Sequence, residues 1–286
     1  MMKIIGTVAV LGTGLLGASL AKALKKRAVA EKVVAWSRSE QTREKCRAFP
    51  SVFDEVYDTP NQAVENADLV VVCSPTSNIV EVIESIVPSL KNGAFITDVG
   101  SVKEVVCQAC RKVLEDKNAI FVGSHPMAGS EKIGIDFSDP ELFEARPCFI
   151  TPYSDGDERC AKKLAEIWEA VGMKVYSVPP DVHDSIVANI SHLPHIVAGT
   201  LCNTALKFPE LDLRNYSGPG FRDSTRISSG NPEIWDSIIA DNRKEIVNAL
   251  KNFSSELNSI IESIENCQSE KIGKFLRDAK AYRDKL

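Results

Sequence analysis

The sequence lacks the features of a nucleic-acid-binding protein and of a membrane-spanning protein. It has no excess of basic residues, since 34 lysines and arginines stand against 39 aspartates and glutamates and the formal net charge is −5. Domains that bind nucleic acid usually carry a clear positive charge. No stretch approaches the roughly 18 uncharged apolar residues of a membrane span. We therefore expect neither nucleic acid nor a membrane as a partner.

The eight cysteines show no framework spacing. Cys107 and Cys110 form a lone CxxC pair on a predicted helix, and no second pair completes a zinc site. We interpret the cysteines as reduced, buried thiols of a cytoplasmic protein, and we expect no bound metal. The apolar run at residues 4–24 superficially resembles a secretion signal, but its glycines have the spacing of a nucleotide-binding loop. We expect this run to belong to the mature protein.

The first part of the chain alternates short apolar runs with helical patterns. The runs that read as buried strands are residues 7–11, 33–36, 69–73, 94–98 and 120–123. The helical segments between them are residues 15–26, 78–90 and 102–114, and two further strands at 148–151 and 174–178 flank a helix at 159–171. Such alternation predicts an α/β fold with a Rossmann-type, doubly wound, mainly parallel sheet. We place this dinucleotide-binding domain at residues 1–178.

The pattern changes after Pro179 and Pro180. Residues 181–208 form a long helical pattern in which Pro194 predicts a kink or break. A loop rich in Gly, Pro and Asn is expected at 213–232, followed by helices at 233–266 and 269–283. We place an all-α domain for substrate binding and dimerisation at residues 179–286. Because so long an apolar helix in a domain of roughly 100 residues needs a cover, we expect a homodimer through this domain.

A glycine-rich loop predicts a dinucleotide site. Gly12, Gly14 and Gly17 form a GxGxxG motif between a predicted strand and a predicted helix, which is the context that the fingerprint requires. The first glycine permits a tight turn, the second lets the backbone approach the pyrophosphate, and the third allows close helix packing. We assign Leu15 and Leu16, at the start of the helix, to the same site, because unpaired amides there face the phosphates. The alternative is a purely structural turn.

The residues after the second strand favour NADP over NAD. NAD-binding chains usually place Asp or Glu about 20 residues beyond the loop. Here Ser37 and Arg38 occupy that place, and the first carboxylate is Glu40. Arginine and hydroxyls suit a 2′-phosphate. We predict that NADP is preferred and NAD possible, and we assign Ser37, Arg38 and Ser74 to the cofactor site. Alternatively, Arg38 is a solvated surface charge and both cofactors bind.

Three of the four histidines lie in two short motifs downstream of this loop. His125 opens the motif HPMAG, and His192 and His195 belong to the motif SHLPH. These motifs resemble the prephenate/arogenate dehydrogenases of tyrosine biosynthesis, as do GSVK at 100–103, SEK at 130–132 and FRDSTRI at 221–227. The resemblance runs from residue 4 to at least Trp235, in the expected order.

The resemblance implies an NAD(P)-dependent dehydrogenase that removes hydride from the ring carbon bearing the hydroxyl while the ring carboxylate leaves as carbon dioxide. With prephenate the product is 4-hydroxyphenylpyruvate. His125 is implied as the catalytic residue, and a neutral imidazole, with an ordinary pKa of about 6.5, suits this task. We expect His125 in a loop after a sheet strand, where ligand-facing residues lie in open α/β folds. The alternative is a loop histidine bonded to the backbone.

The resemblance also implies roles for other residues. Ser101 matches a serine that hydrogen-bonds near the catalytic histidine, although it could instead be the N-cap of the helix at 102–114. Arg226 matches an arginine that binds the substrate carboxylate, with a surface ion pair as the alternative. His195 is implied to line the substrate and nicotinamide site, Glu131 to complete a polar network, and Trp235 to reach in from a neighbouring subunit. We expect His192 to be structural and His183, which has no motif, to lie at the surface.

Other function classes fit less well. The 6-phosphogluconate and β-hydroxyacid dehydrogenases share this layout but use a lysine on the first interdomain helix, and residues 181–206 contain none. A non-enzymatic NADP-binding regulatory protein would have no reason to hold His125, Ser101 and Arg226. Prephenate is the lead substrate and arogenate the alternative. Since helical periodicity runs almost to Leu286, we expect no fused regulatory domain and any tyrosine inhibition to arise at the active site.

Overall fold

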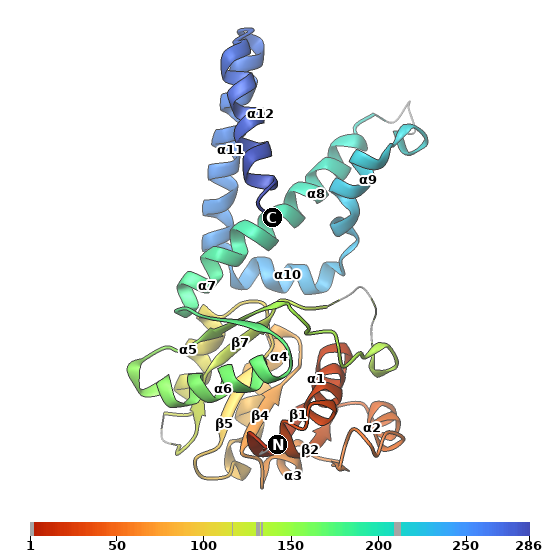
Figure 1. The fold of residues 1–286 in the computed structure, drawn as a ribbon, viewed down its shortest axis with the longest axis vertical. Helices are drawn as coiled ribbons and strands as arrows, with labels where there is room; N and C mark the ends of the chain where they lie inside the picture. Colours follow the sequence, from red (N-terminus) through yellow and green to blue (C-terminus); the bar gives the residue numbers. More distant parts are fainter. Residues whose placement is uncertain (1–2, 116, 130–131, 133, 209–212) are drawn as a thin grey trace. The chain divides into compact units, whose positions relative to one another are not determined.

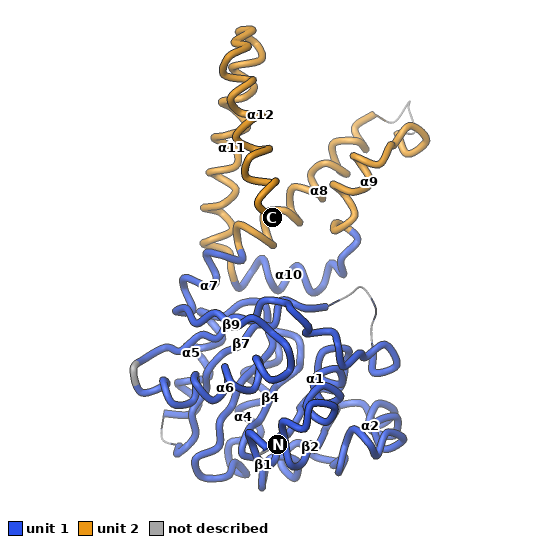
Figure 2. The backbone as a smooth tube through the Cα atoms, in the orientation of Figure 1, with its two compact units in different colours: residues 1–187, 229–241 blue, residues 188–228, 242–286 orange. Residues whose placement is uncertain are grey.

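The computed structural model describes residues 3–115, 117–129, 132, 134–208 and 213–286. Contacts divide the chain into two units, residues 1–187 with 229–241 and residues 188–228 with 242–286 (Figure 2). The division predicted from the sequence, at residues 1–178 and 179–286, stays a prediction. Among the described residues, none of the helices is long and apolar enough to cross a membrane.

Unit 1 is built on a six-stranded parallel sheet (Figure 1). Its strands are β1 (Ile5–Leu11), β2 (Ala30–Trp36), β3 (Glu55–Val56), β4 (Leu69–Val72), β5 (Phe95–Asp98) and β6 (Ile120–Phe121). They lie in the order β3-β2-β1-β4-β5-β6, and each neighbouring pair is parallel. This architecture confirms the predicted Rossmann-type fold. The order reverses between β1 and β4, which is where open α/β sheets bind ligands.

Helices cover both faces of the sheet. They are α1 (Leu15–Lys26), α2 (Glu40–Arg47), α3 (Pro60–Val64), α4 (Thr76–Ile86), α5 (Glu104–Val113) and α6 (Glu158–Ala170). Successive residues of β1 point to opposite faces, so Val8 and Val10 pack into one core and Ala9 and Leu11 into the other. The first core includes residues of α1 and α6, and the second includes residues of α3, α4 and α5. A strand buried on both faces explains the continuous apolar runs.

A second sheet follows the first and corrects one predicted strand. It contains β7 (Gly123–Pro126), β8 (Pro147–Thr151) and β9 (Lys174–Ser177). The sequence predicts one strand at 120–123, but the chain leaves the parallel sheet there. The Val122 amide still donates to the Ile96 carbonyl at 3.0 Å. From Gly123 onward the chain pairs antiparallel with β8, and His125 lies opposite Phe149.

The predicted helix at 181–208 is interrupted, as Pro194 indicated. It consists of α7 (Pro180–Val187), a π-helical turn at Ala188–His192, and α8 (Leu193–Ala205). Pro194 lies in the first turn of α8. Proline has no amide hydrogen to donate to the preceding turn, so a regular α-helical ladder cannot continue through it.

Two other predicted boundaries were wrong. The segment 213–232 is largely helical, with 3₁₀ turns at Leu213–Tyr216 and Arg226–Ser229 around α9 (Pro219–Thr225). Its Gly-Pro pair begins a helix, with Gly218 as the N-cap and Pro219 in the first turn. The helix predicted at 233–266 is divided into α10 (Pro232–Asp241) and α11 (Arg243–Glu265), because Asn242, at the N-cap position of α11, leaves the helical conformation. The last helix, α12 (Ser269–Arg283), has the predicted bounds.

Candidate active site

The glycine-rich loop lies at the switch point of the sheet. Gly12 directly follows β1 and has a φ of +101°. A Cβ at this position would lie 2.7 Å from the carbonyl oxygen of Cys73, which directly follows β4. A Cβ on Gly17 would lie 2.0 Å from the Gly12 carbonyl oxygen, so a side chain would push α1 away from the loop. At Gly14 no heavy atom of the described chain lies within 4 Å of that position, which leaves the backbone open to a ligand.

The start of α1 offers unpaired groups to such a ligand. Gly14 is the N-cap, and within the described residues no side chain makes a capping hydrogen bond to this helix end. The adjacent residues Leu15 and Leu16 are only partly buried. The amides and dipole of a helix N-terminus favour phosphate. Across the switch point, the buried Ser74 hydroxyl has no hydrogen-bond partner within the described chain. These groups fit the phosphates and ribose of a dinucleotide.

Ser37 and Arg38 occupy different environments after β2. Ser37 is buried, and its hydroxyl accepts from the Thr13 amide at 3.0 Å and lies 2.6 Å from the Thr13 hydroxyl. It therefore fixes the glycine-rich loop from behind. Arg38 is exposed. The Arg43 guanidinium, which the sequence did not single out, donates to the carbonyls of Ser37 at 2.8 Å and Arg38 at 3.1 Å, and so orders this turn.

His125 lies on β7 and not in the predicted loop, because the chain pairs with β8 at this point. Its side chain is largely buried. Its Nδ1 lies 2.9 Å from Nε2 of His183, and Nδ1 of His183 lies 2.7 Å from Oδ1 of Asp184. The Asp184 carboxylate also accepts from the backbone amides of Lys103 at 2.8 Å and Glu104 at 2.9 Å. Two imidazoles and a carboxylate thus form a hydrogen-bonded series ending at the start of α5.

The position of His183 corrects the expectation that it lies at the surface. Its side chain is fully buried, because α7 packs on α5 and β8. The Phe149 ring meets the His183 ring edge to face, with centroids 5.2 Å apart and an interplanar angle of 80°. The available sequence signal was a His-Asp dipeptide just after Pro179 and Pro180. An isolated dipeptide of this kind is usually a solvated pair, so the sequence pattern could not distinguish a buried His183 from an exposed one.

A buried polar network lies next to His125 and fixes β7 against β5. The Lys103 ammonium and the Asp98 carboxylate form a fully buried ion pair. Lys103 also donates to the Ser124 carbonyl at 3.1 Å, and the Ser124 amide donates to Asp98 at 3.2 Å. The Ser124 hydroxyl donates to the Asp98 carbonyl at 2.6 Å. A network in which charges are paired and hydrogen-bonded defines one geometry for the neighbouring histidine.

Ser101 follows β5 but does not cap α5. The helix begins at Glu104 with Lys103 as the N-cap, and the Asp184 carboxylate supplies the capping contacts. The Ser101 hydroxyl forms no hydrogen bond within the described part of the chain. It is therefore available to a ligand at the carboxyl end of the sheet.

Unit 2 brings His195 together with the segment that contains Arg226. Burial lowers the pKa of His195, although a hydrogen bond with the Ile227 backbone opposes this effect. The neighbouring Arg226 is exposed and forms no ion pair with the residues that the structure describes. His192 is buried, and its Nδ1 accepts a 3.2 Å hydrogen bond from the side-chain Nδ2 of Asn242, as expected for a structural residue.

The remaining predicted residues are placed as follows. Trp235 lies on α10 in unit 1 and is half-buried. Glu131 lies outside the described residues. Among the described side chains, no group of three or more His, Cys, Asp or Glu could hold a metal ion.

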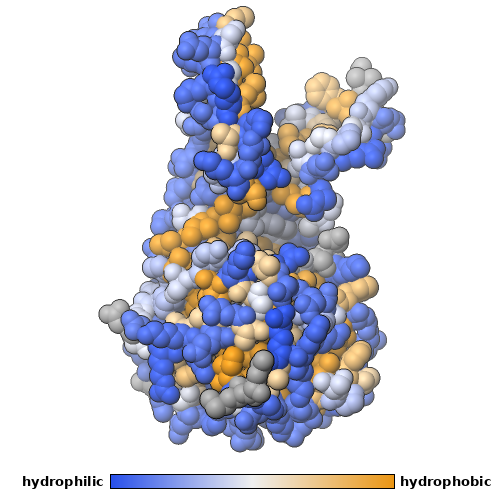
Figure 3. Space-filling view, viewed as in Figure 1, coloured by the Kyte–Doolittle hydropathy of each residue, from blue (hydrophilic) through white to orange (hydrophobic). Residues whose placement is uncertain are grey.

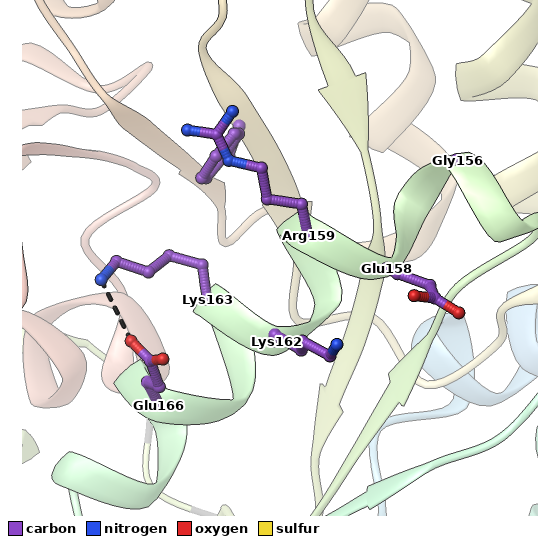
Figure 4. A pocket seen from close by; sticks show the side chains of 7 residues that line it. Gly156, Glu158, Arg159, Lys162, Lys163 and Glu166 are labelled. Carbon is purple, nitrogen blue, oxygen red and sulfur yellow. Dashed lines mark hydrogen bonds and ion pairs between the residues drawn. The ribbon is translucent and has the colours of Figure 1, made fainter.

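The surface also has a pocket on α6 that contains none of these residues (Figure 4). Its lining is mixed in charge, with Arg159, Lys162 and an ion pair between Lys163 and Glu166 at 3.0 Å. Phe95, the first residue of β5, also lines it. Ligands of open α/β sheets bind beyond the carboxyl ends of the strands. This pocket lies at the amino end and is therefore not the active site.

Two protein-family models match the amino-acid sequence of the chain. The nucleotide-binding domain of prephenate dehydrogenase matches residues 20–177, and the dimerization domain of prephenate dehydrogenase matches residues 179–278. A cyclohexadienyl dehydrogenase of Zymomonas mobilis is 31% identical over 99% of this chain and 96% of its own length. A prephenate dehydrogenase of Bacillus subtilis is 30% identical over 98% of this chain and 76% of its own.

Solved structures agree with these matches. A prephenate dehydrogenase from A. aeolicus, in complex with hydroxyphenyl propionate and NAD+, is 30% identical with a TM-score of 0.89, covering 99% of this chain and 98% of that one. An arogenate dehydrogenase of Synechocystis is 30% identical with a TM-score of 0.86, covering 98% and 99%. The chain therefore belongs to the prephenate dehydrogenase family of NAD(P)-dependent oxidoreductases.

Proposed function

We propose that the protein is a prephenate dehydrogenase that oxidises and decarboxylates prephenate to 4-hydroxyphenylpyruvate in the cytoplasm, as a step of tyrosine biosynthesis. The observation that carries this proposal is the match of relatives with this activity over nearly the whole chain. Arogenate is the second candidate substrate, because the cyclohexadienyl and arogenate dehydrogenases cover the chain equally well.

His125 is the proposed catalytic residue. The reaction breaks the C–H bond at the ring carbon bearing the hydroxyl, and the nicotinamide, when bound, accepts this hydride. The C–C bond to the ring carboxylate also breaks, and its electron pair completes the aromatic ring as carbon dioxide leaves. Positive charge develops at the hydroxyl-bearing carbon. An imidazole that accepts a hydrogen bond from the hydroxyl stabilises this charge. With Nδ1 engaged by His183, Nε2 is the nitrogen that performs this task.

Other residues are proposed to hold the substrate. The Ser101 hydroxyl is free to hydrogen-bond near the reacting hydroxyl. Arg226 offers a planar guanidinium that no carboxylate of the described chain neutralises, and this geometry suits a substrate carboxylate. His195, whose pKa is lowered by burial, stays neutral and can line the ring. Glu131 and Trp235 are retained as proposed substrate residues.

The cofactor is proposed to be NADP in preference to NAD. The loop at Gly12, Gly14 and Gly17 with Leu15 and Leu16 would hold the pyrophosphate, and Ser74 would bond to the cofactor across the switch point. Ser37 acts by holding the loop, so the discrimination rests on Arg38. Its exposed guanidinium follows β2, where NAD-binding chains place a carboxylate.

We also propose a homodimer formed through the helical domain. A dimerization domain is the description of the family model that matches residues 179–278. Phe253, Leu257, Ile261 and Ile264 of α11 are 38–58% exposed and recur at helical spacing. Figure 3 shows the apolar side chains along the α11–α12 pair. Exposed apolar stripes of this kind mark interfaces.

The direct test crosses two substrates with two cofactors. Purified protein is assayed with prephenate and with arogenate, each with NAD+ and with NADP+, and kcat/KM is measured for the four combinations. The proposal expects the highest value for prephenate with NADP+. A higher value for arogenate would establish the second candidate, and no reduction of either cofactor with either substrate would reject both.

A further inference from the structure

The buried series behind His125 fixes where its protons lie. Both oxygens of Asp184 accept hydrogen bonds from backbone amides, Oδ1 from Lys103 and Oδ2 from Glu104. Backbone amides can only donate, and such contacts favour the ionised carboxylate. Oδ1 is also the atom that contacts Nδ1 of His183, at 2.7 Å. His183 therefore donates its Nδ1 proton to Asp184.

The tautomer of His183 determines that of His125. A neutral His183 with its proton on Nδ1 has a lone pair on Nε2. The Nε2 atom of His183 lies 2.9 Å from Nδ1 of His125, so His125 donates its Nδ1 proton to this lone pair. A neutral His125 with its proton on Nδ1 has its own lone pair on Nε2.

We propose that His183 and Asp184 are positioning residues that hold His125 in the Nδ1-protonated tautomer and so present Nε2 as the hydrogen-bond acceptor. This inference rests on the proposed function, which needs that acceptor, and it adds two residues that touch neither substrate nor cofactor in the proposed roles. The carboxylate at the end of the series also stabilises the positive charge that His125 gains as it shares the substrate proton. Such an orienting carboxylate is a known way to activate a histidine base.

Burial makes this arrangement effective. The side chains of His183 and Asp184 are 0% and 1% exposed, so water does not substitute for either partner. The Phe149 ring restrains the His183 ring from the β8 side. The nearby charged groups are Asp98 of β5, Lys103 and Glu104 at the start of α5, and Asp241 of α10. Lys103 is already paired with Asp98. Burial, and then the charge of Asp184, raises the pKa of Asp241.

A magnetic resonance measurement tests the tautomer without any substrate. The full-length protein is labelled with ¹⁵N-histidine, and the four histidines are assigned with the single variant His125→Asn and its counterparts. The inference expects neutral His125 to carry its proton on Nδ1 and its lone pair on Nε2 near neutral pH. A resting protein with the His125 proton on Nε2 would overturn it. A wild type without dehydrogenase activity would reject the proposed function. The resonance measurement would still show whether His125 has the inferred tautomer.

Variants of His183 separate positioning from packing. His183→Gln keeps an amide oxygen that can accept the His125 Nδ1 proton, whereas His183→Phe fills similar space with no acceptor. We expect kcat to fall at least about tenfold in His183→Phe and to be largely retained in His183→Gln, with similar KM values, since loss of the orienting group allows the wrong tautomer. Equal losses in the two variants would contradict the inference.

Asp184→Asn tests whether the negative charge of Asp184 favours protonation of His125 and His183. Removal of the carboxylate makes protonation of the histidine pair harder, so the acidic limb of the kcat/KM profile should move to lower pH by about one pH unit. Asp157→Asn is the matched control, since Asp157 is also buried and accepts from the amides of Tyr153 at 2.9 Å and Ser154 at 3.0 Å. The control should change stability but not the pH profile. An unmoved limb in a folded Asp184→Asn protein would overturn the inference.

Discussion

At the residue scale, His125 is placed by groups that lie far from it in the chain. Its strand pairs with β8, His183 lies 58 residues downstream, and the ion pair between Asp98 and Lys103 lies upstream. The motif HPMAG can be recognised in the sequence because its residues are consecutive. The role of His183 and Asp184 cannot be recognised there, because only the packing of α7 on α5 and β8 brings them to His125. The sequence thus predicts the histidine but not its orientation.

The first prediction concerns this histidine. His125→Asn should preserve the fold and cofactor affinity but lower turnover by about 10²–10⁴-fold, which is the usual contribution of a positioned acid–base group. Wild-type activity should also decline toward acidic pH as the imidazole becomes protonated. Stopped-flow or steady-state rates, with cofactor binding measured separately, provide the check. A variant within threefold of the wild type would remove His125 from the mechanism.

The second prediction concerns cofactor choice. Arg38→Ala should raise the dissociation constant for NADP+ by about 10–100-fold, equivalent to about 1.4–2.8 kcal/mol, and leave that for NAD+ almost unchanged. NADP+ and NAD+ differ only in the 2′-phosphate. The difference between the two changes in dissociation constant therefore measures the contact of Arg38 with this phosphate. Arg47→Ala is the control, because Arg47 lies on the nearby α2 but binds Asp58 at 2.6 Å. Equal weakening of both cofactors would show that Arg38 contacts a feature that they share.

At the element scale, the strongest predictions came from strands buried on both faces. β1 and β4 are almost wholly apolar. Glycine is required at Gly12 and Gly17 because a Cβ would lie 2.7 Å and 2.0 Å, respectively, from a backbone oxygen. The elements α2, α3 and β3 were missed because they are short or mostly polar, with eight, five and two residues. The segment 213–232 was misassigned because its Gly and Pro content is shared by loops and helix starts.

The third prediction concerns an ion pair that joins α1 to β2. Asp54 binds the Lys25 ammonium at 2.8 Å and the Val33 amide at 2.7 Å. Burial alone would raise the pKa of Asp54, but these contacts outweigh it and the pKa is lowered. The stabilisation is therefore present above the ordinary carboxyl pKa of about 4 and is lost as pH falls through the lowered value.

Asp54→Asn should accordingly lower the midpoint of thermal unfolding at pH 7 by about 2–4 °C, corresponding to about 1 kcal/mol after allowance for solvent exposure. The difference from the wild type should shrink as pH falls below about 4. Asp278→Asn, which removes an exposed pair with Lys274 on α12, should have little effect at either pH. A pH-independent loss in Asp54→Asn would assign its effect to packing.

At the scale of the whole molecule, α11 exposes apolar side chains that one chain does not cover. The fourth prediction is that the wild type sediments as a dimer and that Leu257→Lys raises the dissociation constant of this dimer at least about tenfold. A two-fold interface contains the substitution once from each chain and therefore buries two lysine charges. Glu256→Lys introduces the same side chain one position away and should remain dimeric. A monomeric wild type would remove the homodimer from the account.

An enzyme of the proposed kind couples hydride removal to decarboxylation, so the stoichiometry of the products shows whether this chain does so. Prephenate is incubated with the wild type and NADP+, and the reduced cofactor, the carbon dioxide and the 4-hydroxyphenylpyruvate formed are quantified from one reaction. We expect equal amounts of all three products, and almost none with His125→Asn on the same timescale. Reduction of the cofactor without carbon dioxide, or no reduction with prephenate or arogenate and either cofactor, would contradict it.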